Sequence, residues 1–169
     1  MRVYLPATTT TLRRLADGGR LQPAPLTAFA VTSGIRAWYT DEDEDQLDYA
    51  ASGQAVRASL RMVDADPCAA RRRVVLAADV PDSVVDQHDE LDRGAVRVDA
   101  TVGLDTIVAV HIDDADAEET VARAAAVVLE ADLGLESAQQ VVDDAEGFEL
   151  AWYAPQELAE LLATVEEPS

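Results

Sequence analysis

Near the middle of the chain the sequence reads Arg73-Val74-Val75-Leu76-Ala77-Ala78-Asp79, and Pro81 follows two residues later. A strand with one wet face alternates apolar and polar residues, whereas five apolar residues in a row are typical of a strand that is covered on both faces. We therefore expect residues 73–79 to form a central strand of a sheet that carries helices on both sides.

Strand and helix patterns alternate on either side of this run. Period-two alternation or a short apolar run predicts strands, and apolar residues spaced three and four apart predict helices. The order predicts an α/β (α+β) fold, namely a mixed sheet of about six strands with helices packed against it. The expected strands are 2–6, 27–32, 73–79, 96–102, 107–112 and 148–153, and the expected helices are 8–15, 35–39, 47–62, 116–133, 137–144 and 155–165.

The chain has no low-complexity linker at which it would divide. We therefore expect one globular domain over residues 1–165, with residues 166–169 as a frayed C-terminus. The apolar runs are too short to span a bilayer, so no membrane partner is expected. The single cysteine, Cys68, cannot form an internal disulfide, which fits a reducing compartment and predicts a cytoplasmic location. Strand order and oligomeric state have no signature in the sequence.

The charge balance is unusual, because 33 acidic residues stand against 13 basic ones, all of them arginine, for a formal net charge of −20. The electrostatic field of such a negative net charge repels nucleic acid and attracts a basic protein partner. Only residues 71–73 form a run of three arginines, and neighbouring residues of a strand point to opposite faces, so they make no single patch for nucleic acid. A GC-rich genome and halophilic adaptation are alternative origins of the charge.

Acidic residues end two of the expected strands. Carboxylates at strand ends of an open α/β sheet are a candidate Mg²⁺ site, here Asp79, Asp113 and Asp114. Helix capping or exposure to water is the competing interpretation of the same residues. His111 is a candidate general base or, alternatively, a hydrogen-bonded structural residue. The sequence shows no Ser-His-Asp arrangement and no glycine-rich phosphate loop, so we expect no cofactor.

Two aromatic pairs and one acidic run are candidates for an interface. Aromatic residues dominate both cores and binding hot spots, so core packing is the alternative role of the two pairs. A dense acidic run could dock a basic partner through contacts that weaken with salt. The candidate interface residues are Trp38, Tyr39, Asp41, Glu42, Asp43, Trp152 and Tyr153.

Several phrases of the sequence resemble a known protein family. They are MRVYLPAT at 1–8, AVTS at 30–33, VVLAADVP at 74–81, VAVHIDDAD at 108–116 and AWYAPQE at 151–157. Together they resemble an uncharacterised actinobacterial family of short acidic proteins, a domain of unknown function. The resemblance covers nearly the whole chain and implies a cytoplasmic protein, without an activity.

Residues 1–113 also resemble, in layout, small proteins with an ADP-ribosyltransferase-like fold. That resemblance implies an NAD pocket at Tyr4, Thr32 and Ser33. The first strand carries Tyr4 and Leu5 where those enzymes place a His or Arg, and no later catalytic Glu is recognised, so the implied site is degenerate.

The sequence thus favours a non-catalytic interaction or regulatory domain that binds a basic protein partner through its acidic surface. The alternative is a degenerate or divergent ADP-ribosyltransferase-like enzyme that binds NAD.

Overall fold

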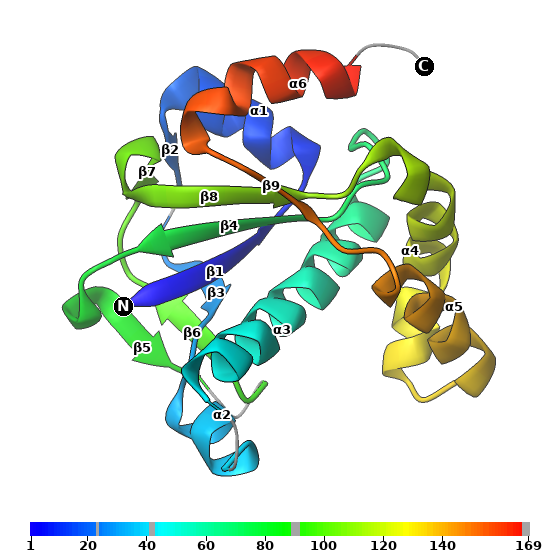
Figure 1. Ribbon diagram of the computed structural model, residues 1–169, viewed down its shortest axis with the longest axis horizontal. Coiled ribbons are helices and arrows are strands. Elements are labelled where there is room, and N and C mark those ends of the chain that lie inside the picture. The colour runs from blue at the N-terminus through cyan, green and yellow to red at the C-terminus, as the bar shows by residue number, and fades with distance from the viewer. Residues whose placement is uncertain (23, 41–42, 89–91, 167–169) are drawn as a thin grey trace.

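A seven-stranded sheet forms the centre of the computed structural model, which describes residues 1–22, 24–40, 43–88 and 92–166 (Figure 1). The strand order is β5-β6-β3-β1-β4-β8-β9, and a separate ribbon pairs β2 with β7. The strands are β1 (Arg2–Ala7), β2 (Arg20–Leu21), β3 (Leu26–Phe29), β4 (Val74–Asp79), β5 (Val85–Gln87), β6 (Ala95–Val98), β7 (Val102–Gly103), β8 (Ile107–Ile112) and β9 (Ala151–Tyr153).

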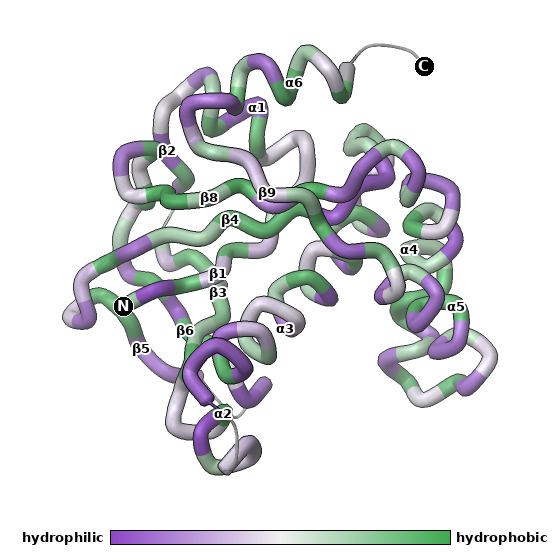
Figure 2. The backbone as a smooth tube through the Cα atoms, in the orientation of Figure 1, coloured by the Kyte–Doolittle hydropathy of each residue, from purple (hydrophilic) through white to green (hydrophobic). Residues whose placement is uncertain are grey.

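The strand β4 is the covered inner strand that the apolar run predicts. It lies between β1 and β8, and residues 74–78 are all buried. Figure 2 shows the matching band of hydrophobic residues along β4 and β8. The expectation of an α/β domain with one sheet and helices packed against it is confirmed.

The sheet differs from the expected one in two respects. Each strand pair of the described residues is antiparallel, where a mixed sheet was expected. The expected strand 96–102 is divided between β6 and β7, because the chain leaves the sheet after Val98 and pairs with β2 instead. β5 lies in a stretch that has too few apolar residues to predict a strand.

Helices cover both faces of the sheet (Figure 1). On one face α1 (Thr9–Gly18) and α6 (Leu158–Glu166) share the largest apolar cluster with side chains of β1, β4 and β8. On the other face lies α3 (Glu44–Ala65), preceded by the short α2 (Ser33–Trp38). The helices α4 (Glu118–Asp132) and α5 (Glu136–Glu146) pack together and against the end of α3 through Leu60 and Val63. None of the helices in the described residues is long and apolar enough to cross a bilayer.

A buried ion pair joins β4, β8 and the chain that follows α5. Arg73 is 2% exposed and Asp113 is fully buried. The Nε and Nη2 atoms of Arg73 donate to the two carboxylate oxygens at 2.8 Å each, and the backbone N–H of Arg73 donates to Oδ2, also at 2.8 Å. Nη2 of Arg73 also donates to the carbonyl oxygen of Phe148 at 3.1 Å. The pair therefore fixes three chain segments that are far apart in sequence.

Removal of the Asp113 carboxylate would leave the Arg73 guanidinium buried without its counter-charge. We expect Asp113→Ala to lower the free energy of unfolding by about 3–5 kcal/mol, measured by equilibrium unfolding in urea. The control is Glu119→Ala, which removes the exposed partner of Arg123 and should change stability little. A loss for Asp113→Ala no larger than that of the control would contradict the structural role of the pair.

Candidate functional site

A cleft of about 980 Å³ opens on the α3 face of the sheet, between α3 and the segment that runs from α5 into β9. This volume is at the upper end of the range of ligand-binding pockets. Val75 and His111 lie at its floor, since both belong to inner strands of the sheet. Its two walls include Tyr49, Gly53 and Arg57 of α3 on one side and Glu146, Phe148 and Trp152 on the other.

The cleft exists because α3 covers only part of its sheet face. Tyr4 and Phe29 pack in the apolar cluster beneath α3. The next row of the sheet pairs Val75 with His111 and His111 with Trp152, and cross-strand partners of this kind face the same side. Val75 is fully buried in the same cluster, so the row is open only from the half-buried His111 to the exposed Trp152, on the side toward α5.

His111 contributes the cleft's one imidazole. Burial lowers the pKa of His111, because the low-dielectric surroundings disfavour the charged ring. Its ring makes no hydrogen bond to another residue in the described part of the chain. A neutral imidazole carries one donor and one acceptor nitrogen. Asp113, which follows in sequence, is bound to Arg73 and does not act on this ring.

The arginines that line the cleft are bound to carboxylates. Arg57 and Arg61 share Asp132, and Arg73 pairs with Asp113. The acidic residues that line it are Asp92, Glu146 and Glu149. None of these three forms an ion pair with another described residue. Besides the hydrogen bond from Arg61 to Asp132, Asp92 acts on that guanidinium at longer range and helps to raise its pKa. The unpaired negative charge of the lining is thus that of Glu146 and Glu149, whereas its arginines all have carboxylate partners.

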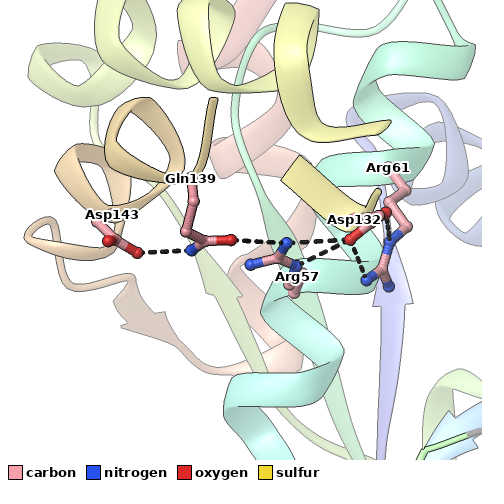
Figure 3. A network of polar contacts seen from close by, with 5 residues as sticks. All are labelled: Arg57, Arg61, Asp132, Gln139 and Asp143. Atoms are coloured by element: carbon pink, nitrogen blue, oxygen red, sulfur yellow. Dashed lines mark hydrogen bonds and ion pairs between the residues drawn. The ribbon is translucent and has the colours of Figure 1, made fainter. Parts of the chain in front are cut away.

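Figure 3 shows the network that holds the α5 side of the cleft in place. Asp132, at the end of α4, accepts from Arg57 Nη2 at 3.0 Å and from Arg61 Nε at 2.7 Å. Arg57 Nη2 also donates to Gln139 Oε1 at 3.2 Å, and Gln139 Nε2 donates to Asp143 at 2.7 Å. A carboxylate near a helix C-terminus is unfavourable by the helix dipole, so the two guanidinium groups offset that repulsion. The network ties α3 to α4 and α5.

Two large aromatic side chains stand exposed on opposite sides of the cleft. Tyr49 of α3 is 70% exposed and Trp152 of β9 is 59% exposed. Exposed aromatic residues around a cleft are typical of binding surfaces. The aromatic pattern of the sequence predicts Trp152 as an interface residue but does not single out Tyr49.

The structure brings Tyr39 and Trp152 of the candidate interface residues to the cleft. Trp38 lies outside it, with the Arg93 guanidinium 3.6 Å from the centre of its ring, and Tyr153 packs with the α1–α6 cluster on the other sheet face. Asp43 caps α3 by accepting from the Gln46 backbone N–H. Asp41 and Glu42 lie outside the described residues.

The residues of the implied NAD pocket do not line this cleft. The Tyr4 hydroxyl donates to Asp48 at 3.0 Å, and burial together with that carboxylate raises its pKa to about 12. Thr32 caps α2 and donates to the Arg93 carbonyl oxygen. Ser33 donates to Gln87 on β5. The polar groups of all three are thus engaged within the fold.

The candidate metal ligands lie apart. β4 and β8 are antiparallel, so the ends of the two strands lie at opposite sides of the sheet. Asp79 pairs with Arg2 at one end, and Asp113 binds Arg73 at the other, beside the exposed Asp114. Over the residues that the structure describes, no three His, Cys, Asp or Glu side chains gather as a metal site would require. The expectation of gathered carboxylates depends on parallel strands, which this sheet lacks.

The chain belongs to a family of unknown function (DUF6912), whose model matches residues 1–162. No curated protein and no solved structure matches it. The description of the family names no activity, so the evidence on the role of the cleft lies in its own residues.

The network around Asp132 predicts how stability changes in acid. Hydrogen bonds from Arg61 lower the pKa of Asp132 below its usual value, so its stabilising effect is present above about pH 4 and is lost as the pH falls further. We expect Asp132→Asn to lower the free energy of unfolding by about 1 kcal/mol at neutral pH. The difference from the wild type should shrink below pH 4 in urea unfolding curves.

The matched control is Glu130→Gln, an equal change of charge at a neighbouring exposed position of α4. It should leave stability nearly unchanged over the same pH range. An Asp132→Asn deficit that persisted undiminished in acid would show that the charge of Asp132 does not stabilise the fold.

Proposed function

We propose that this chain is a non-catalytic binding domain whose cleft takes a positively charged segment of a partner protein. The observation that carries the proposal is the charge of the lining: its arginines are neutralised by carboxylates, while Glu146 and Glu149 have no ion pair in the described structure. The net charge of −20 adds a long-range attraction that steers a basic partner toward the cleft.

The dimensions of the cleft favour an extended chain segment. The part of α3 that lines it runs from Gln46 to Arg61, which corresponds to about 22 Å of helix at 1.5 Å per residue. An extended peptide of about seven residues has the same length. A compact small molecule would leave much of this length empty.

The aromatic side chains supply contacts that suit a cationic segment. Tyr49 and Trp152 flank the cleft from α3 and from β9. Arginine and lysine side chains bind over aromatic faces, and tyrosine and tryptophan are frequent hot spots of protein interfaces. These contacts would add affinity that does not depend on salt as strongly as the ion pairs do.

The chemistry of the cleft supports binding more than catalysis. The His111 ring makes no hydrogen bond to the hydroxyl groups of the lining, those of Ser52, Tyr39 and Tyr49, nor to any carboxylate of the described residues. A nucleophile and its base would lie within hydrogen-bond reach of each other. The NAD-binding alternative would place its pocket at Tyr4 and Thr32, away from these residues. A cytoplasmic location fits the exposed thiol of Cys68.

Binding of a fluorescent hepta-arginine peptide, followed by anisotropy at low and at high salt, tests the proposal. We expect the double variant Glu146→Gln/Glu149→Gln to bind about tenfold more weakly than the wild type at low salt. The control Glu119→Gln/Glu130→Gln changes the net charge equally on α4, outside the cleft, and should bind nearly as well as the wild type.

An equal loss in both double variants would mean that only the overall charge attracts the peptide, which would refute a specific site in the cleft. A rise in melting temperature with NAD, without peptide binding, would instead support the transferase-like alternative.

A further inference from the structure

We propose that the partner segment binds as an added strand along the open edge of β9, with alternating basic and apolar side chains. This inference rests on the proposed function of the cleft and specifies the kind of segment it binds. β9 is the last strand of the sheet order and carries Trp152, which lines the cleft.

The outer edge of β9 has free backbone groups. Ala151, Trp152 and Tyr153 pair with Ile112, His111 and Val110 of β8. Within the described residues, the backbone of 151–153 makes no hydrogen bond to any segment other than β8. An edge of this kind can accept the backbone of another chain, the mode of binding known as β-strand addition.

The two edges of the sheet differ in how they are protected. Proteins commonly guard an exposed edge with charged residues, proline or a covering segment. β5, the opposite edge, carries Asp86, and its Gln87 accepts hydrogen bonds from Ser33 at the start of α2. β9 reads Ala-Trp-Tyr, has no charge of its own and exposes most of its tryptophan. It therefore lacks the protection that β5 has.

The two faces of β9 lie in different surroundings. These surroundings specify which side chains should alternate along the bound partner segment. Trp152 faces the cleft, next to His111, on the side where Glu146 and Glu149 lie. Tyr153 faces the other side, where it packs with the apolar α1–α6 cluster that also includes Val165. Successive side chains of a strand point to opposite faces. An added strand would thus direct every second side chain toward acidic groups and the others toward an apolar surface.

Two heptapeptides of identical composition test this pattern, Arg-Val-Arg-Val-Arg-Val-Arg and Arg-Arg-Arg-Arg-Val-Val-Val. We expect the alternating peptide to bind the wild-type chain about tenfold more tightly in anisotropy at low salt. A strand uses the backbone N–H groups of alternate residues on its paired side. N-methylation of one alternate set of the peptide should therefore weaken binding at least about tenfold, and N-methylation of the other set should change it little. Amide exchange of residues 151–153 should slow when the alternating peptide is bound.

The outcomes separate this inference from the proposed function. Equal binding of both peptides, insensitive to N-methylation and still weakened by Glu146→Gln/Glu149→Gln, would overturn strand addition and leave the cationic cleft standing. Failure of both peptides and of hepta-arginine to bind would overturn both. The sequence order and the N-methylation are changed in the peptides, so the test of strand addition uses the wild-type protein.

Discussion

The buried pair of Arg73 and Asp113 is the contact on which the cleft depends. It joins the start of β4 to the end of β8 and holds the carbonyl oxygen of Phe148, just after α5. Removing two charges from water is expensive, and the bidentate geometry with a backbone N–H on the same carboxylate offsets that expense. Because Phe148 is fixed, the chain enters β9 at a defined place, and Trp152 reaches the cleft.

The arginines take part in ion pairs between elements, and this explains why the surface of the cleft is negatively charged. Arg57, Arg61 and Arg73 each bind a carboxylate that belongs to another element, so they hold elements together, and the described lining of the cleft has no arginine without a carboxylate partner. With 33 acidic residues and 13 arginines, most carboxylates are left without such a partner. Where they border a cleft, as Glu146 and Glu149 do, the same imbalance is the basis of the proposed binding of a cationic segment.

The sequence predicts the individual strands and helices where the pattern of apolar residues is strong. The apolar run at 74–78 identified the inner strand β4, and the spacing of apolar residues identified α4. The antiparallel order had no such signal, so the expected meeting of Asp79 with Asp113 was not found. The cleft was not predicted either, because Tyr49, Glu146 and Trp152 are far apart in sequence and meet only once α5 packs beside α3. The spacing of Arg57 and Arg61 by one helical turn was a signal that could have indicated a shared partner.

The packing of α3 does not require a glycine at position 53, although the absence of a side chain there leaves the cleft wider. Gly53 lies inside this helix and lines the cleft, and a Cβ atom built there would meet no other atom within 4 Å. Glycine inside a helix costs about 1 kcal/mol relative to alanine, and the fold gains nothing here in return, since no close contact or left-handed backbone demands it. The missing side chain widens the cleft at the middle of the α3 wall. A helix serving only as a cover for the sheet would be more stable with alanine, so Gly53 contributes nothing to the stability of α3, and the room that it leaves agrees with the proposed binding of an extended segment.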